Sequence, residues 1–101
     1  MEELTEQMLV VNPLGMHARP AARVVQTVLQ FASEVHVQHN GQRVNAKSIM
    51  GLLTLSAAQG SRVTVTCKGP DARAAMDAVR ALFAAGFGDE PSGSGRGCLR
   101  L

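Results

Sequence analysis

The sequence predicts an α+β fold, an open-faced β-sandwich in which a four-stranded antiparallel sheet is covered on one face by three helices. The segments that favour strands alternate apolar and polar residues, as strands with one solvent-facing side do. The segments that favour helices each carry one apolar stripe, so each has a single face to bury. These segments follow one another in the order β-α-β-β-α-β-α, and a sheet layered against helices buries their apolar faces together.

The first predicted strand and the first predicted helix are separated by a loop that begins at Asn12. The run MLVV at 8–11 favours a short strand, which Asn12-Pro13 ends because proline cannot donate into a sheet ladder. From Ala18 onward, apolar residues recur at spacings of three and four, which predicts a helix with one buried face. That face consists of Ala21, Val24, Val25, Val28 and Ala32.

A hairpin and a short helix are predicted in the middle of the chain. Residues 34–38 alternate polar and apolar, and the Asn-Gly pair at 40–41 suits a two-residue turn, so a second hairpin strand is expected at 42–45. Ser48 then stands where its hydroxyl can cap a short helix that begins at Ile49.

The last strand and the last helix are predicted in the segment that follows Gly60. Residues 61–67 alternate in the strand pattern, which places Cys67 among the buried residues. A turn at 69–71 leads into a helix over 72–83, and Gly86 is its expected stop. We expect one domain over residues 1–88 and a flexible, Gly/Ser-rich tail at 89–101.

Composition and charge exclude several classes of function. Ten basic and eight acidic residues are spread along the chain with three aromatic residues, which provides neither a basic stripe for a nucleic-acid backbone nor rings for base stacking. No apolar run approaches the roughly 20 residues that cross a bilayer. The two cysteines are far apart and no signal-peptide pattern is present. We therefore expect a cytoplasmic protein that binds no nucleic acid and does not insert into a membrane.

A single histidine, His17, stands just before the first predicted helix, in the segment NPLGMHARPAARVV. The N–H groups in the first turn of a helix lack intrahelical acceptors and attract anions. A phosphoryl group on the imidazole would be held there by first-turn amides such as that of Ala18 and by the guanidinium of Arg19, while Gly15 gives the loop backbone freedom. Histidine has an ordinary pKa of about 6.5, so its imidazole is largely neutral at cytosolic pH, and the neutral ring can act as a nucleophile. From these residues alone, a solvated loop histidine beside a surface arginine is at least an equal alternative.

This segment closely resembles the active-site segment of HPr, the histidine-containing phosphocarrier family of the bacterial sugar phosphotransferase system. The segments SEVHVQHNG, NAKSIMGLLTL and QGSRVTVTCKG are similar to later parts of the same family, so the resemblance covers residues 5–86. It implies the open-faced β-sandwich, phosphorylation of His17 on the ring nitrogen nearer Cβ, and stabilisation of the phosphate by Arg19. It also implies enzyme I as the donor, sugar-specific IIA components as acceptors, no metal or organic cofactor, and a phosphoryl carrier instead of a stand-alone enzyme.

Ser48 is a second candidate site. The segment AKSIMGLL resembles the form of the family whose serine is phosphorylated by HPr kinase/phosphorylase, which implies a regulatory role for Ser48 and a catabolite-control regulator as a further partner. Helix capping is the other role open to Ser48. A phosphate there would add nearly two negative charges beside the docking face and repel acidic partners. The apolar docking residues expected beside His17 are Ala18, Ala22, Ile49, Met50 and Leu53, although a core position is an alternative for Ile49, as for Leu52.

Two further functions stay open. A nitrogen-related phosphocarrier would use the same His17 chemistry to feed a regulatory kinase chain. A purely regulatory module would dock a transcription factor through phosphorylated Ser48, but such paralogues lose the histidine. Many members of the family carry lysines along the first helix, where this chain has Arg23 with Gln26 and Gln30. Docking is therefore expected to depend more on apolar contact than on charge.

Overall fold

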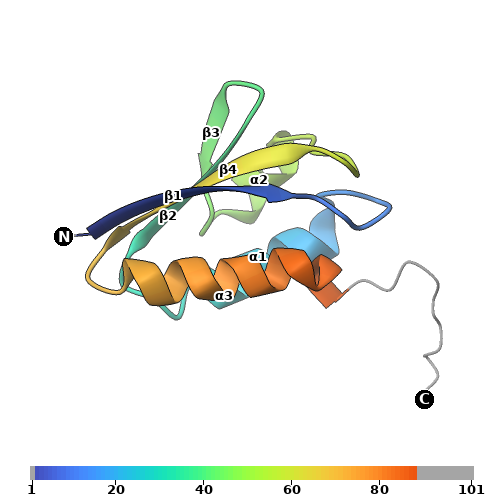
Figure 1. Cartoon of the computed structure of the whole chain (residues 1–101). Coiled ribbons are helices and arrows are strands. Elements are labelled where there is room, and N and C mark those ends of the chain that lie inside the picture. Colours follow the sequence, from blue (N-terminus) through green and yellow to red (C-terminus); the bar gives the residue numbers. More distant parts are fainter. Residues whose placement is uncertain (1, 89–101) are drawn as a thin grey trace, which may run out of the picture.

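The computed structural model of the protein describes residues 2–88, and its strands and helices follow the predicted order (Figure 1). The strands are β1 (Glu2–Leu9), β2 (Glu34–His39), β3 (Gln42–Asn45) and β4 (Arg62–Gly69). The helices are α1 (Ala18–Val28), α2 (Ile49–Thr54) and α3 (Ala72–Ala84), and a 3-10 turn, η1, follows at Gly86–Gly88. The tail predicted at 89–101 lies outside the described residues.

The four strands form one antiparallel sheet in the order β1-β4-β2-β3, so β1 and β3 are its edges within residues 2–88. Figure 1 shows α1 and α3 side by side along one face of the sheet, and α2 packs against α1 and β3. The side chains of β2 and β4 that point toward the helices are apolar and buried. They include Val35, Val37, Val63 and Val65. The predicted open-faced β-sandwich is therefore confirmed.

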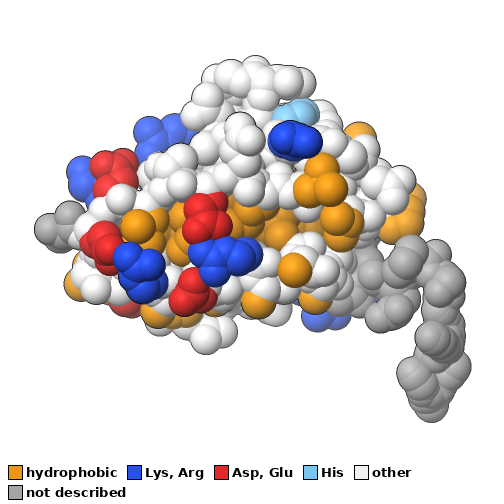
Figure 2. Space-filling model, viewed as in Figure 1, with side chains coloured by type: hydrophobic (Ala, Val, Ile, Leu, Met, Phe, Trp, Pro, Cys, Tyr) orange, Lys and Arg blue, Asp and Glu red, His pale blue; other side chains and the backbone are white. Residues whose placement is uncertain are grey.

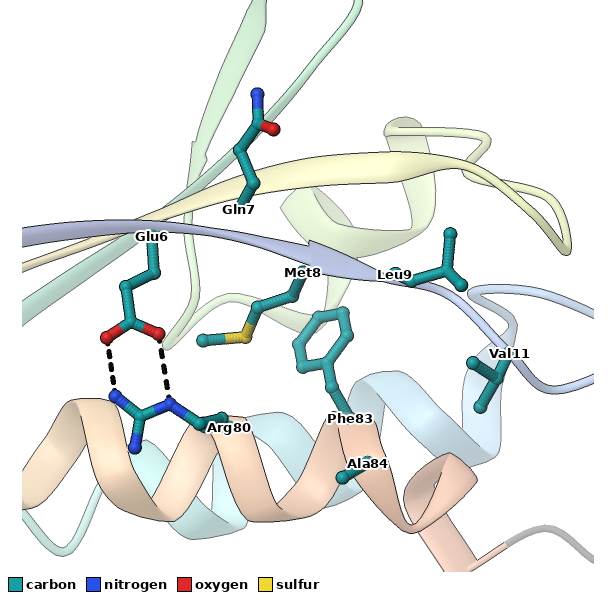
Figure 3. A pocket seen from close by; sticks show the side chains of 8 residues that line it. All are labelled: Glu6, Gln7, Met8, Leu9, Val11, Arg80, Phe83 and Ala84. Atoms are coloured by element: carbon teal, nitrogen blue, oxygen red, sulfur yellow. Dashed lines mark hydrogen bonds and ion pairs between the residues drawn. The ribbon is translucent and has the colours of Figure 1, made fainter.

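β1 begins earlier than the sequence pattern predicts, because it spans Glu2–Leu9 instead of 8–11. Its eight residues pair with β4 along their whole length. Glu6 points toward α3, where Arg80 donates to its carboxylate from Nε at 3.0 Å and from Nη2 at 2.5 Å (Figure 3). These hydrogen bonds lower the pKa of Glu6. Glu6 is a charged residue on the helix side of β1, so it interrupts the apolar alternation by which the strand could be predicted. Its position is explained by Arg80, which is far along the chain in α3.

α1 is shorter than predicted, because it ends at Val28 and the predicted stripe residue Ala32 is exposed. The chain turns beyond this end against Asp71, whose carboxylate accepts the N–H groups of Ala32 and Ser33, each at 2.9 Å, and the Ser33 hydroxyl at 2.5 Å. These bonds, first that from the Ser33 hydroxyl, lower the pKa of Asp71. Asp71 starts α3 as predicted, but its side chain connects the segment after α1 to the start of α3 and does not cap α3.

The core is aliphatic, with one aromatic contact near the end of α3. Cys67, in β4, is fully buried in this core as the alternation predicts, and burial raises the pKa of its thiol to about 11. The rings of Phe83 and Phe87 meet edge to face with centroids 4.6 Å apart. This contact packs η1 onto the core, directly after the helix that supports β1.

Candidate functional site

The loop between β1 and α1 is held against a second loop, which precedes β4. The Val10 N–H donates to the Ser61 carbonyl at 2.9 Å, and the Gly60 N–H donates to the Val10 carbonyl at 2.8 Å. Gln59 adds a side-chain hydrogen bond from Nε2 to the Val11 carbonyl at 3.0 Å. The two backbone bonds of Val10 extend the β1–β4 pairing beyond the strands and fix the point from which the loop to α1 departs.

Gly15 lies where the two loops come closest together. Its φ is +70°, and a Cβ atom at this position would collide with the carbonyl oxygen of Ala57. The N–H of the next residue, Met16, donates to that same oxygen at 2.8 Å, and the Met16 side chain is buried. Both the backbone conformation and the available space therefore require glycine, and Met16 anchors the chain directly before His17.

His17 is the N-cap residue of α1, as the sequence predicts. Its backbone is extended, with φ −112° and ψ −167°, and its carbonyl accepts the Ala21 N–H at 3.0 Å. The side chain is partly exposed and, among the described residues, makes no capping hydrogen bond to α1. His17 therefore caps α1 through its backbone and not through its side chain.

The first turn of α1 suits an anion. Ala18 and Arg19 are exposed, and Pro20, which is buried, has no N–H to satisfy. Within residues 2–88, the first turn contains no acidic side chain that would compete with a phosphate for its N–H groups. The helix dipole adds partial positive charge at this end. The structure thus places His17, Ala18 and Arg19 at one helix start, directly after the constrained Gly15.

Ser48 is the N-cap residue of α2, and its Oγ accepts the Gly51 N–H at 3.1 Å. The predicted capping role is therefore confirmed. Because α2 packs against α1, the two helices that carry the two sequence motifs are neighbours.

The predicted docking residues differ in exposure. Met50 is 73% exposed and Ile49 is 40% exposed, so the alternative of a core position for Ile49 is wrong. Leu53 and Ala22 are partly buried, and Ala18 is exposed. Leu52 is fully buried, as its core interpretation expects. α2 therefore offers an apolar surface at its start and uses Leu52 to hold itself on the core.

Two residues of the β1–α1 loop are not singled out by the sequence. Leu14 is 78% exposed, and Asn12 is only 2% exposed. The Asn12 side chain donates from Nδ2 to the Gly15 carbonyl at 2.6 Å. The sequence assigns Asn12 a turn-forming role before Pro13 and gives no sign that its side chain is buried. An apolar residue inside a predicted loop is the one signal that points to Leu14.

A separate concave surface lies between β1 and α3. Figure 2 shows an apolar band across this face, crossed by acidic and basic side chains. Figure 3 shows an open pocket in it, where Met8 and Phe83 point toward each other and Glu6 pairs with Arg80. None of the predicted site residues lines this pocket. In the described part of the chain, no three His, Cys, Asp or Glu side chains gather as metal ligands, and no helix is both long and apolar enough to span a bilayer.

Comparison with known proteins identifies the family. The family model described as "PTS HPr component phosphorylation site" matches residues 4–85. This chain belongs to the HPr family. The phosphocarrier protein HPr of Cupriavidus necator is 45% identical over 86 residues, which are 85% of this chain and 97% of that protein. The crystal structure of HPr-C-His from Thermoanaerobacter tengcongensis matches with a TM-score of 0.79 at 41% identity, covering 89% of this chain and 99% of that one.

The same comparisons include a relative that is named as HPr-like. The HPr-like protein Crh of Halalkalibacterium halodurans is 43% identical over 78 residues, which are 77% of this chain and 93% of that protein. Membership of the HPr family gives the protein a phosphocarrier role in the phosphotransferase system and, in general terms, contacts with the enzymes of that system. The resemblance found in the sequence is confirmed.

Replacing Gly15 by alanine is expected to destabilise the protein more than the same change at Gly41. Both residues have positive φ, at +70° and +81°, but apart from Gly41 and its two chain neighbours no described residue has an atom within 4 Å of a Cβ atom built on Gly41. Gly41→Ala is therefore expected to lower the free energy of unfolding by about 1 kcal/mol, the cost of the left-handed conformation. Gly15→Ala adds the collision with Ala57 and is expected to lower it by roughly 2 kcal/mol or more. Urea denaturation of both variants measures the difference, and equal losses would contradict the close approach of the two loops.

Proposed function

We propose that the protein accepts a phosphoryl group on His17 from phosphorylated enzyme I and passes it to sugar-specific IIA components in the cytoplasm. The observation that carries the proposal is the position of His17, a partly exposed residue, at the N-cap of α1. A partner protein can reach a ring in that position, and a group attached to the ring lies next to first-turn N–H groups that favour anions.

The transfer uses neutral imidazole with its proton on Nε2, which leaves a lone pair on Nδ1. The lone pair attacks the phosphorus atom, the Nδ1–P bond forms, and the bond between phosphorus and the enzyme I group breaks with its electron pair left on that group. Transfer to IIA reverses these roles, because a nucleophile of IIA attacks the phosphorus and the electrons of the Nδ1–P bond return to the ring. Negative charge spreads over the phosphoryl oxygens in both steps, so fixed positive groups beside them lower the barrier.

Ala18 and Arg19 are the residues we assign to those positive groups. The backbone N–H groups of a first turn point out of the helix along its axis, toward the space in front of the N-cap residue. Arg19 adds a permanent charge and a planar set of N–H donors that fits phosphate oxygens. Both residues are exposed, so the oxygens of an incoming phosphoryl group reach them without rearrangement of the core.

Phosphorylation by enzyme I tests the proposal directly. With enzyme I and phosphoenolpyruvate, the wild-type protein is expected to gain one acid-labile phosphate, and His17→Ala none. Arg19→Ala is expected to fold normally and to accept the phosphate about tenfold more slowly, because one charged donor is lost. Arg23→Ala is the matched control, since Arg23 is also exposed on α1 but lies beyond the first turn. A wild-type protein that takes up no phosphate, or equal rates for the two arginine variants, would contradict these assignments.

We also propose that the exposed start of α2 is the apolar centre of the surface that docks enzyme I and IIA. Ile49 and Met50 lie on the helix next to α1, and methionine adapts its shape to several partners. Ala18, Ala22 and Leu53 extend this surface with small or partly buried side chains. The formal net charge of +2 is modest, so apolar contact is expected to contribute more than long-range attraction.

Truncation of Met50 is expected to weaken docking without changing the chemical step. Met50→Ala should raise the KM of enzyme I for this protein about five- to tenfold, as loss of a central apolar anchor does, with kcat unchanged. Leu29→Ala is the matched control, because Leu29 is 61% exposed but lies at the other end of α1. A KM that is the same for Met50→Ala and wild type, or raised equally by Leu29→Ala, would place the docking surface elsewhere.

Ser48 supports a second, regulatory function, because its hydroxyl lies at the N-cap of α2 beside the proposed docking surface. A phosphate on Oγ would be stabilised by the start of α2 and would repel acidic groups of enzyme I. We propose that HPr kinase/phosphorylase modifies this hydroxyl and that the product binds a catabolite-control regulator.

Incubation with HPr kinase and ATP, followed by mass spectrometry, is expected to show one serine phosphate on the wild type and none on Ser48→Ala. The exposed Ser56, whose φ is +53°, provides the control variant Ser56→Gly, which should be modified like the wild type. Absence of serine phosphate on the wild type would contradict the regulatory role.

A further inference from the structure

We infer that Asn12 is a positioning residue for the phosphorylation of His17, an inference that rests on the function proposed above. Asn12 is a polar residue with only 2% of its surface exposed, in the β1–α1 loop five positions before His17. Burial of an amide is unfavourable unless the amide is hydrogen-bonded, so its position indicates a specific use of its donors. That use is the hydrogen bond from Nδ2 to the Gly15 carbonyl at 2.6 Å.

The Gly15 carbonyl joins Asn12 to His17. The same oxygen that accepts Asn12 Nδ2 also accepts the His17 backbone N–H at 3.1 Å. In the opposite direction, the Gly15 N–H donates to the Asn12 carbonyl at 3.1 Å. Asn12 is therefore hydrogen-bonded to Gly15 through both its side chain and its backbone. Its side chain and the backbone N–H of His17 share one acceptor, the Gly15 carbonyl oxygen.

A single peptide plane, between Gly15 and Met16, is held at both ends by these contacts. Its oxygen accepts Asn12 Nδ2, and its N–H donates to the Ala57 carbonyl at 2.8 Å. A peptide plane fixed at both ends cannot rotate without breaking a hydrogen bond at each end. Because this plane is the last one before the plane that carries the His17 N–H, its orientation determines where α1 begins and how the imidazole is presented.

The loop has little packing that would replace the Asn12 side chain. Leu14, between Asn12 and Gly15, is 78% exposed, and Pro13 is also exposed. Pro13 restricts Asn12 itself to extended backbone conformations, which limits the directions that its side chain can take. Loss of the side-chain donor is therefore expected to weaken the hold on the oxygen end of the peptide plane, which then keeps its hydrogen bond from the His17 N–H, while the fold and the start of α2 stay as they are.

Removal of the Asn12 side chain is expected to lower the rate of phosphoryl transfer and to leave the affinity for enzyme I unchanged. Misplacement of a reacting group by about an ångström costs up to about a hundredfold in rate. Asn12→Ala is expected to lower the single-turnover rate of transfer from phosphorylated enzyme I at saturation by about tenfold or more. The concentration of protein that gives half of this rate is expected to stay within about twofold of the wild type, because Ile49 and Met50 are untouched.

Gln59→Ala is the matched control for this experiment. Gln59 also donates a side-chain amide hydrogen bond to a carbonyl of the same loop, that of Val11 at 3.0 Å, but this bond does not reach Gly15 or His17. Gln59→Ala is expected to transfer at the wild-type rate. Asn12→Asp is the second test variant, since it keeps the shape of the side chain and, when ionised, has no proton to donate; the same rate loss is expected for it.

Amide hydrogen exchange provides a readout that does not depend on enzyme I. Exchange at the Met16 and His17 N–H groups is expected to be faster in Asn12→Ala than in Gln59→Ala, with unchanged protection in β4. The inference is overturned if the folded Asn12 variants transfer at the wild-type rate, if Gln59→Ala loses as much rate, or if exchange at His17 is unaltered. A wild-type protein that accepts no phosphate contradicts the proposed function itself, so the two failures are distinct.

Discussion

The close approach of the β1–α1 loop to Ala57 is the contact on which the rest of the site depends. Gly15 permits it because it has no Cβ atom to collide with the Ala57 carbonyl oxygen. The approach brings the Met16 N–H to 2.8 Å from that oxygen and buries the Met16 side chain. With Met16 fixed, the next residue, His17, is the partly exposed N-cap of α1. One backbone contact thus helps to set the position of the helix start.

In the function proposed above, the start of α1 contributes orientation and charge, whereas the bond that forms and breaks is on the imidazole of His17. First-turn N–H groups are fixed dipoles that need no reorganisation when a phosphoryl group arrives. The start of α2, next to α1, offers Ile49 and Met50 as apolar contacts for a partner. In the proposed function, the chemistry takes place at the start of α1 and partner recognition at the start of α2, and a phosphate on Ser48 would act on recognition by adding charge next to Met50.

Patterns among residues that are close in the sequence predict much of this structure. The features that these patterns do not predict depend on contacts between residues that are far apart in the sequence. The alternation around Cys67, the Ser48 cap and the buried face of α1 as far as Val28 depend on neighbours in the sequence, and all three are found where expected. The full length of β1 depends on pairing with β4, and the end of α1 lies beside a carboxylate from Asp71, far along the chain. The burial of Asn12 likewise depends on how two loops pack, which no periodicity in its own segment records.

The central claim is that the start of α1 is a phosphate site that exists before phosphorylation. Two-dimensional proton–nitrogen NMR of the protein before and after treatment with enzyme I and phosphoenolpyruvate tests it most directly. We predict that the amide protons of Ala18 and Arg19 shift downfield as they donate to phosphoryl oxygens, while signals from β2 and β4 stay in place. A phosphorylated protein in which these two amides do not move, or in which signals change throughout the sheet, would contradict a preformed site.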